Sequence, residues 1–197
     1  MFRVLLGGTF DPPHIAHLVA GEVAYRQLDA DRITFLPAGS PWQKAGRRVT
    51  PGADRLEMTR LATEPIDYFE ADGREVARDG WTFTIDTLLS FDDSDRLVLV
   101  LGADAAAGVR TWHRWEAVLE RATVAVLPRP GTPREAVVEA VPSAVWLDMP
   151  KLDVSGTEIR RRASAGLSVR FLVADAVWRY IEASELYRHD EVGAGEG

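Results

Sequence analysis

Two histidines follow a glycine-rich segment near the start of the chain, in the run Gly7-Gly8-Thr9-Phe10-Asp11-Pro12-Pro13-His14-Ile15-Ala16-His17. Paired glycines let the backbone turn sharply and approach a ligand closely. A helix that begins near His14 directs its N-terminal amides at that ligand, which makes the turn an anion site. His14 and His17 are three residues apart, so both imidazoles project from one side of the helix. Beside a bound phosphate, they can donate hydrogen bonds to oxygens that gain charge as a bond breaks.

Two other kinds of site fit this run less well. A zinc site would need a third ligand, but the chain has no cysteine and only four histidines, and helical zinc histidines typically stand four residues apart. We therefore expect no protein metal site. A dinucleotide fingerprint would need a third glycine at the start of the helix, and this run has none.

A second candidate anion site lies near the C-terminal end. Ser155 and Glu158 form the pattern of a capping box, with serine at the N-cap and glutamate three residues later. Arg160, Arg161 and Arg162 follow about one turn inside the same helix start, where backbone amides favour an anion. We expect Arg160 to face the anion and the other two arginines to lie on the surface.

The candidate residues stand at the ends of predicted strands. Apolar runs alternate with helical patterns, which is typical of an α/β fold with a Rossmann-like, doubly wound parallel sheet flanked by helices. Strands are predicted at 3–6, 32–36, 67–71, 96–101, 124–127 and 145–147. Helices are predicted at 14–28, 53–62, 83–90, 115–121, 134–140, 156–165 and 174–182, the last two forming a C-terminal pair. Ligands bind beyond the carboxyl ends of such strands, so the loops to inspect are 7–13, 37–50, 102–114 and 151–155.

Composition restricts the class of protein. The hydrophobic share is 46% and the charged share is 27%, both ordinary for a globular domain. The net charge of −7 argues against an extended nucleic-acid surface, and no apolar run is long enough for a membrane span. We expect one domain over 1–190 with a flexible tail over 191–197. The chain begins with a strand-like stretch rather than a signal peptide, so we expect it to be cytoplasmic.

The first run resembles the G-G-T-F-D-P-x-H-x-G-H signature of the nucleotidyltransferase superfamily, in the version carried by bacterial nicotinate-mononucleotide adenylyltransferases. Ala16 stands where glycine is usual, which exchanges one small residue for another. The resemblance implies a set of ATP-binding residues and a catalytic pair: Gly7, Gly8, Thr9, Phe10 and Asp11, with His14 and His17 as the pair. It extends through the closing Leu186-Tyr187, so it covers essentially the whole chain.

Two more segments resemble the ATP side of that family. Pro37-Ala38-Gly39-Ser40-Pro41-Trp42-Gln43-Lys44 stands where P-P-H-K is common. This implies that Lys44 reaches the ATP phosphates and is catalytic, although Trp42-Gln43 departs from the pattern. The segment 155–160 resembles S-S-T-x-x-R, with Gly156 in place of the second serine. It implies phosphate binding by Ser155 and Thr157 and a catalytic role for Arg160.

Two segments resemble the mononucleotide side. The segment 82–87 resembles a T-x-D-T helix start, where Thr84 is a good N-cap from its residue type alone. Gly102-Ala103-Asp104 resembles G-x-D, whose carboxylate lies near the ribose, and Trp112 matches a tryptophan that stacks on the pyridine ring. The implied mononucleotide-binding residues are Thr84, Asp104, Trp112 and His113. Backbone amides around Trp112-His113 are expected to meet a nicotinate carboxylate, whereas Trp115 is predicted to lie in the core.

The resemblance implies transfer of the adenylyl group of ATP to nicotinate mononucleotide, with release of pyrophosphate and formation of nicotinate adenine dinucleotide. The acceptor phosphate is ionised at neutral pH and needs no general base. Catalysis would then rest on positioning and charge stabilisation, with Mg²⁺ on the triphosphate. ATP and nicotinate mononucleotide are the expected partners, and a homo-oligomer stays open.

Several other functions compete with this one. A phosphopantetheine adenylyltransferase typically lacks the first histidine and the downstream tryptophan, and a cytidylyltransferase is favoured less. An oxidoreductase that binds a finished dinucleotide would need the glycine fingerprint and an acidic residue where Leu36-Pro37 stands. A non-catalytic nucleotide sensor would not need both histidines together with Lys44 and Arg160. An aminoacyl-tRNA synthetase would need more length for an anticodon domain.

Overall fold

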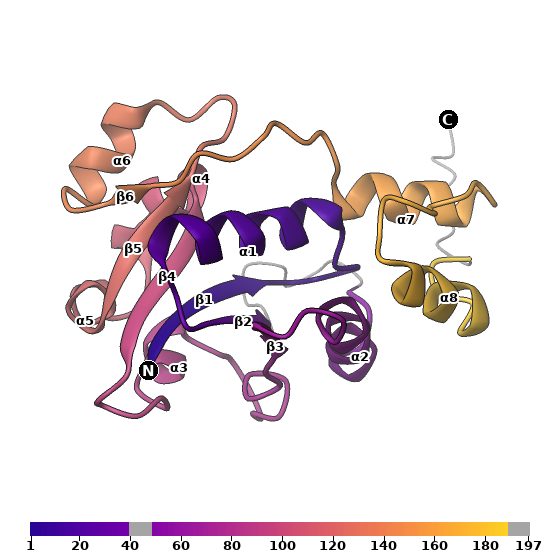
Figure 1. Ribbon diagram of the computed structural model, residues 1–197, viewed down its shortest axis with the longest axis horizontal. Coiled ribbons are helices and arrows are strands. Elements are labelled where there is room, and N and C mark those ends of the chain that lie inside the picture. Colours follow the sequence, from indigo (N-terminus) through magenta and orange to yellow (C-terminus); the bar gives the residue numbers. More distant parts are fainter. Residues whose placement is uncertain (40–48, 189–197) are drawn as a thin grey trace, which may run out of the picture.

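The six strands form one parallel sheet, in the order β3-β2-β1-β4-β5-β6 (Figure 1). The computed structural model describes residues 1–39 and 49–188. Its strands are β1 (Phe2–Gly8), β2 (Arg32–Pro37), β3 (Phe69–Ala71), β4 (Arg96–Gly102), β5 (Ala122–Leu127) and β6 (Val145–Trp146). All six expected strands are present, and the predicted Rossmann-like sheet is confirmed. Chain order reverses between β1 and β4, which makes the carboxyl ends of these two strands the switch point.

The helices include every one that the sequence predicts and one more. They are α1 (Ile15–Leu28), α2 (Gly52–Thr63), α3 (Thr84–Leu88), α4 (Ala103–Ala107), α5 (Trp115–Arg121), α6 (Arg134–Ala140), α7 (Gly156–Ser164) and α8 (Asp175–Ala183). The segment 102–114, expected to be a loop, instead contains α4 and a 3₁₀ turn, Val109–Thr111. Four of the five residues of α4 are alanine, the strongest helix former, which explains the difference.

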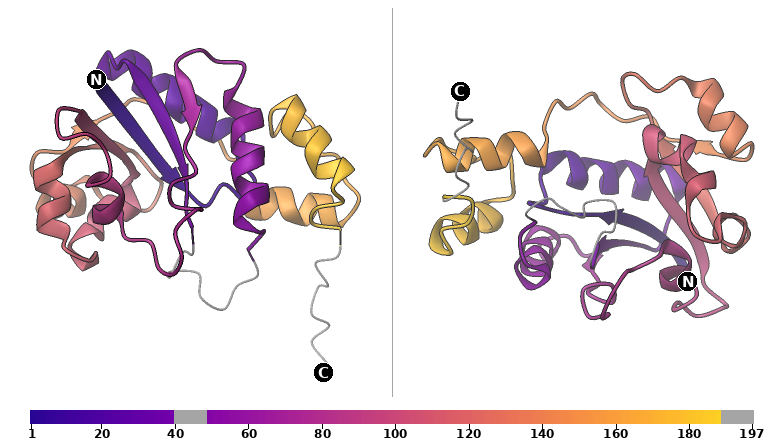
Figure 2. Two further views of the ribbon diagram at one scale, coloured as in Figure 1. Left: turned by 90° about the horizontal axis from the view of Figure 1, so that it is seen from below. Right: turned by 180° about the vertical axis from the view of Figure 1, so that it is seen from behind.

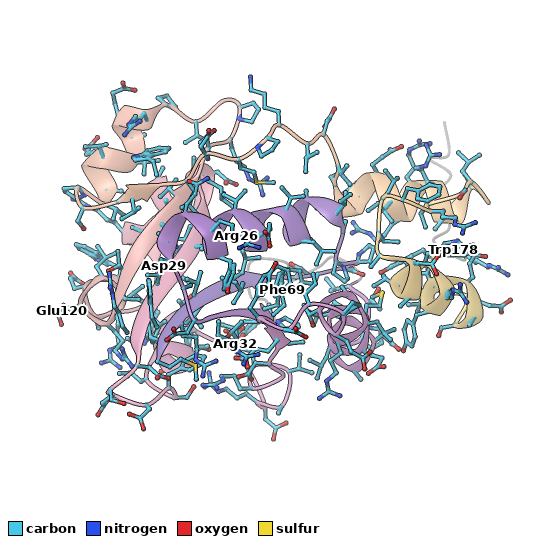
Figure 3. All side chains as sticks on the ribbon, viewed as in Figure 1. Arg26, Asp29, Arg32, Phe69, Glu120 and Trp178 are labelled. Atoms are coloured by element: carbon cyan, nitrogen blue, oxygen red, sulfur yellow. The ribbon has the colours of Figure 1, made fainter. Side chains whose placement is uncertain are left out.

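The sheet is buried on both faces because alternate strand residues enter different cores. Leu5 and Leu99 pack with Ile85 of α3 on one face. Val4 and Val98 belong to the cluster on the other face, which α1 covers. Figure 3 shows Phe69 in the same region, between α1 and the strands. Strands covered in this way carry continuous apolar runs, which is why they could be recognised from the sequence.

The C-terminal helices do not lie on the sheet. Figures 1 and 2 show α7 and α8 beside α2, at the end of the molecule away from β5 and β6. Met58 and Ala62 of α2 share a third core with Ile159 of α7 and with Val177 and Ile181 of α8. This core holds the start of α7 close to the loop that follows β1. None of the helices in the described part of the chain is long and apolar enough to cross a membrane.

Candidate active site

The loop from β1 to α1 brings the two histidines together. His14 is the N-cap of α1, and its backbone N–H donates to Nδ1 of His17 at 3.1 Å. The imidazole rings stack with centroids 3.7 Å apart and planes at 25°. The rings therefore lie on one side of the helix start, as the spacing predicts. Because Nδ1 of His17 accepts a hydrogen bond, the neutral ring carries its proton on Nε2.

Burial keeps both imidazoles neutral at pH 7. Burial, with a smaller contribution from the charge of Arg129, lowers the pKa of His14 to about 4. Burial also lowers the pKa of His17 well below its ordinary value, with smaller effects from His14 and Arg129. Nδ1 of His14 is buried and has no hydrogen-bond partner within the described residues. A neutral imidazole has one N–H donor, so the pair offers hydrogen bonds rather than fixed charge.

Phe10, expected among the ATP-binding residues, has a buried side chain. It is 1% exposed, and its ring packs edge-on against His17 with centroids 4.9 Å apart. On another side it lies against Phe35 at 5.9 Å. The phenyl ring thus supports the histidine from within the core.

Arg160 and Asp11 connect the two candidate anion sites. Nη1 of Arg160 donates to the backbone carbonyl of Asp11 at 2.6 Å, and Nη2 donates to the hydroxyl of Thr157 at 3.3 Å. The Asp11 carboxylate accepts from the hydroxyl of Tyr187 at 2.8 Å and from the backbone N–H of Thr50 at 3.3 Å. The start of α7 therefore lies against the first loop, although 149 residues separate Arg160 from Asp11.

Ser155 caps α7 as expected, but the capping box is formed only in part. The Ser155 hydroxyl accepts from the backbone N–H of Glu158 at 3.2 Å. The Glu158 carboxylate pairs with Arg161 at 2.7 Å instead of reaching back to Ser155. Arg161 is 60% exposed, in agreement with its predicted surface position.

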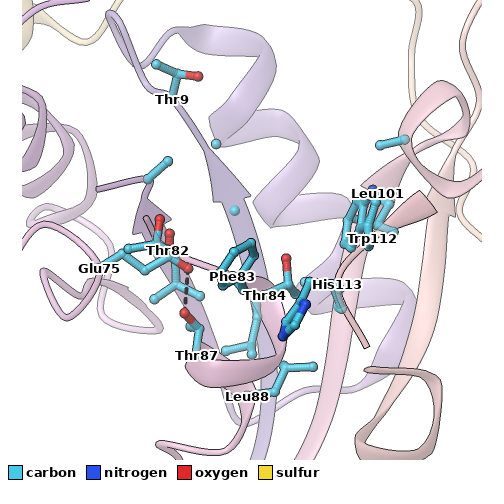
Figure 4. Close-up of a pocket in the computed structure, with 17 residues that line it drawn as sticks. Thr9, Glu75, Thr82, Phe83, Thr84, Thr87, Leu88, Leu101, Trp112 and His113 are labelled. Atoms are coloured by element: carbon cyan, nitrogen blue, oxygen red, sulfur yellow. Dashed lines mark hydrogen bonds between the residues drawn. The ribbon is translucent and has the colours of Figure 1, made fainter. Parts of the chain in front are cut away.

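A pocket of about 260 Å³ lies between α3 and the carboxyl-terminal halves of β1 and β4 (Figure 4). Its position is the switch point at which doubly wound sheets bind ligands. The polar and aromatic part of its lining comprises Thr9, Glu75, Thr82, Phe83, Thr84, Thr87, Trp112 and His113. In Figure 4, Glu75 and Thr82 lie on one side, with Trp112 and His113 on the other.

Three of the four residues expected to bind the mononucleotide line this pocket, namely Thr84, Trp112 and His113. The His113 ring lies 4.5 Å from the ring of Phe83. Thr84 is not the N-cap of α3, because Phe83 takes that position with extended backbone and Thr84 becomes the first helical residue. The Thr84 side chain therefore lies in the pocket lining rather than capping the helix.

Asp104 lies apart from these three residues. Its side chain is 64% exposed and pairs with Arg129 at 3.5 Å, and it is not part of the pocket lining. Trp115 is half-buried rather than in the core, with the Arg110 guanidinium 5.5 Å from its ring centroid.

The backbone donors near Trp112 differ from the expectation. The Trp112 N–H is bonded to the carbonyl of Val109 at 2.9 Å because it closes the 3₁₀ turn. It is thereby occupied, whereas the backbone N–H of His113 has no partner within the described residues. Thr84 and His113 both line this end of the pocket, so the Thr84 hydroxyl and the His113 amide are candidate donors to a ligand there.

The sequence did not single out Glu75 or Arg55. Glu75 lines the pocket, accepts from the hydroxyl of Thr87 at 2.7 Å, and has its pKa raised by burial. Arg55 is 2% exposed. Its position was detectable in principle, because Arg55 shares one face of α2 with Met58 and Ala62, at helical spacing. Charged residues are rarely buried, so the spacing alone did not suggest that Arg55 lies in the core.

Lys44 and Trp42-Gln43 lie outside the described residues, as does the expected tail over 191–197. Within residues 1–39 and 49–188, no group of three or more histidine, aspartate or glutamate side chains could hold a metal ion.

Comparisons with known proteins agree on one family. The model of the cytidylyltransferase-like family matches residues 5–162. The probable nicotinate-nucleotide adenylyltransferase of Desulfitobacterium hafniense (strain Y51) is 36% identical over 195 residues, covering 93% of this chain and 94% of the relative. The corresponding Corynebacterium glutamicum protein is 40% identical over 190 residues, covering 93% and 87%. Plasmodium falciparum nicotinic acid mononucleotide adenylyltransferase complexed with NaAD has a TM-score of 0.75 at 16% identity, covering 95% and 98%, which supports the fold.

Proposed function

The chain belongs to the cytidylyltransferase-like family, among the nicotinate-nucleotide adenylyltransferases, and from this premise we propose that it transfers the adenylyl group of ATP to nicotinate mononucleotide. The products are nicotinate adenine dinucleotide and pyrophosphate. The observation that carries the proposal is a neutral histidine pair on the same β1–α1 connection whose Gly7, Gly8 and Thr9 line a pocket that contains an indole.

The reaction is a direct attack of the mononucleotide 5′-phosphate on the α-phosphorus of ATP. The new P–O bond forms as the bond to the β-phosphate oxygen breaks, and pyrophosphate leaves with the electron pair. The attacking phosphate is already ionised, so the site needs donors and positioning rather than a base. Nε2–H of His17 is a suitable donor to an oxygen that gains charge, and His14 supplies a second imidazole beside it.

The triphosphate is proposed to lie along the first loop and the start of α7. Arg160 and Lys44 supply positive charge, and the residues expected to bind ATP on the two segments are Gly7, Gly8, Thr9, Phe10, Asp11, Ser155 and Thr157. Because the ring of Phe10 is buried, this residue is proposed to contact ATP only through its backbone. The amides at the start of α7 favour an anion in the same place.

The pyridine ring is proposed to stack on Trp112, where an indole offers a flat face to an electron-poor ring. The His113 amide and the Thr84 hydroxyl then meet the nicotinate carboxylate. A carboxylate only accepts hydrogen bonds, whereas a carboxamide brings donors of its own and leaves some site donors unpaired. Asp104 is proposed to accept from the ribose hydroxyls, outside the apolar part of the pocket.

Mg²⁺ is proposed to arrive with ATP as part of the substrate. The Asp11 carboxylate accepts one hydrogen bond at each oxygen, from Tyr187 and from Thr50, and no group of three or more histidine, aspartate or glutamate side chains in the described residues could hold the ion. The triphosphate oxygens would therefore hold the ion, which supplies charge neutralisation when bound. Residues 1–190 as one catalytic domain, a tail over 191–197 and a cytoplasmic location remain part of the proposal.

A pyrophosphate-release assay with a panel of substrates tests the function. We expect rapid release with ATP, Mg²⁺ and nicotinate mononucleotide, and much slower release with nicotinamide mononucleotide. Replacing ATP by CTP checks the donor, because the family name covers cytidylyltransferases. Release with phosphopantetheine alone, or with CTP in preference to ATP, would assign the chain to a different branch of the family.

A further inference from the structure

A buried arginine joins the two loops that follow β1 and β2. The Arg55 side chain donates to three backbone carbonyls: from Nη1 to Thr9 at 2.8 Å, from Nη2 to Gly39 at 3.0 Å and from Nε to Thr50 at 2.9 Å. Thr9 belongs to the first loop, and Gly39 and Thr50 belong to the second. A fully buried charge is tolerated only when it is well hydrogen-bonded, and the planar guanidinium matches three acceptors in a fixed geometry.

A buried tyrosine reaches the same loop from the far end of the chain. Tyr187 is 8% exposed, and its hydroxyl donates to Oδ1 of Asp11 at 2.8 Å. The N–H of Thr50 donates to Oδ2 of the same carboxylate at 3.3 Å. Thr50 thus accepts from Arg55 through its carbonyl and donates to Asp11 through its amide. We call the three side chains Asp11, Arg55 and Tyr187 the loop anchor.

The loop anchor lies next to the residues proposed to act on ATP. Arg160 bonds to the carbonyl of Asp11, and His14 follows Asp11 by three residues at the start of α1. Displacing the first loop would therefore move the histidines and Arg160 relative to each other. A misplacement of about 1 Å can reduce a rate by roughly a hundredfold.

We propose that Arg55 and Tyr187 are positioning residues for the ATP half of the site. Neither touches the nucleotide; both set the course of residues 9–11 and hence the spacing between the histidine pair and Arg160. The proposal rests on the adenylyltransferase function. It also makes Asp11 part of the loop anchor, because its two carboxylate oxygens accept from Tyr187 and from Thr50.

A purely stabilising role makes a different prediction. Loss of a buried hydrogen bond would then lower the free energy of unfolding without distinguishing ATP from the acceptor. The mononucleotide pocket includes neither Arg55 nor Tyr187 in its lining. A selective effect on ATP is therefore the signature of positioning.

The test compares Tyr187→Phe with Tyr180→Phe. Each change removes one tyrosine hydroxyl that donates to an aspartate. Tyr180 is the control because its hydroxyl donates to Asp54 of α2 at 2.8 Å, outside the loop anchor. We expect Tyr187→Phe to raise the KM for ATP, or lower kcat, by about tenfold or more, with the KM for nicotinate mononucleotide changed by less than about twofold. We expect Tyr180→Phe to change none of these. Equal effects of the two variants, or parallel increases in both KM values, would overturn the proposal.

A second pair of variants covers the case in which Tyr187→Phe does not fold. Arg55→Lys keeps the charge but cannot reach three carbonyls, and Arg60→Lys is its control on the exposed side of α2, where Arg60 is 60% exposed. Calorimetric binding of α,β-methylene ATP with Mg²⁺ measures the ATP site without turnover. We expect weaker binding only for Arg55→Lys, and unchanged binding would contradict the proposal. If the wild type binds this analogue and yet forms no dinucleotide from ATP and nicotinate mononucleotide, the proposed function fails. In that case the binding measurement still tests the positioning role.

Discussion

The histidine pair is matched to phosphate chemistry by its burial. An imidazole with its pKa lowered to about 4, as for His14, is neutral throughout the physiological range. Such a ring donates a hydrogen bond without placing a permanent positive charge in the core. Negative charge on a bound triphosphate favours the protonated form, so the pKa values of both rings should rise when ATP binds. The spacing of the two residues was visible in the sequence, but their protonation state depends on Phe10 and on neighbours that only the fold brings together.

At the same scale, Trp112 can be separated from its neighbour Trp115. Trp112→Ala removes the proposed stacking surface, so we expect the KM for nicotinate mononucleotide to rise by about tenfold or more while the KM for ATP changes little. Trp115→Ala is the matched control, because this indole lies outside the pocket lining. Steady-state kinetics with each substrate varied in turn provides the measurement. A larger effect on ATP than on the mononucleotide would contradict the placement of the pyridine ring.

Among the elements, the start of α7 lies unusually close to the first loop. A Cβ atom on Gly156 would stand 2.8 Å from the carbonyl oxygen of Asp11, closer than non-bonded atoms approach. The family pattern that the segment 155–160 resembles has serine at this position. The structure gives glycine a positive role, since it permits the bond from Arg160 to Asp11.

Gly156→Ser, which restores the common residue, should therefore impair the protein. We expect the added side chain to displace the Asp11 carbonyl and to lower kcat/KM for ATP by about tenfold, with a loss of about 1–3 kcal/mol in the free energy of unfolding. Ala165→Ser at the exposed end of the same helix is the control. Kinetics and urea unfolding of both variants give the answer. Unchanged or improved activity of Gly156→Ser would show that this close approach is not maintained in solution.

Elements were predictable wherever local pattern decides them. Short apolar segments identified all six strands, three of them as continuous apolar runs, and helical patterns identified seven of the helices. The prediction failed for α4, where we expected a loop between a predicted strand and the next predicted helix although the residues are nearly all alanine. It failed for the capping role of Thr84 because hydrogen-bonding residue types favour but do not determine a cap. Arg55 could not be assigned because its acceptors are backbone carbonyls on distant loops, which leave no signal in residue types.

For the molecule as a whole, the two ends of the chain are joined at the site. Tyr187 and Asp11 are 176 residues apart, and the core shared by α2, α7 and α8 makes their contact possible.

Burying two neutral histidines in this arrangement links folding to pH. An unfolded histidine binds a proton below about pH 6.5, whereas folded His14 does so only near pH 4. The unfolded state therefore binds more protons in this window, and stability falls as the pH falls through it.

We expect the free energy of unfolding to decrease between about pH 6.5 and about pH 4.5, mainly because of His14 and His17. Glu75 acts in the opposite direction, since burial raises its pKa and the folded state then takes up its proton first. The double variant His14→Gln with His17→Gln isolates the histidine contribution. Urea unfolding of both proteins across the window should show a smaller acid loss in the variant. An identical loss would mean that the pair is exposed to protonation in the folded state.

The most direct test of the central claim follows the α-phosphorus of ATP. The wild-type protein is incubated with α-³²P-labelled ATP, Mg²⁺ and nicotinate mononucleotide, and the labelled products are separated and identified by mass. We predict that the label enters nicotinate adenine dinucleotide, with one pyrophosphate released for each dinucleotide formed, because the acceptor phosphate attacks the α-phosphorus directly. Label recovered as AMP or as adenylylated protein, with the mononucleotide unconsumed, would contradict adenylyl transfer to this acceptor.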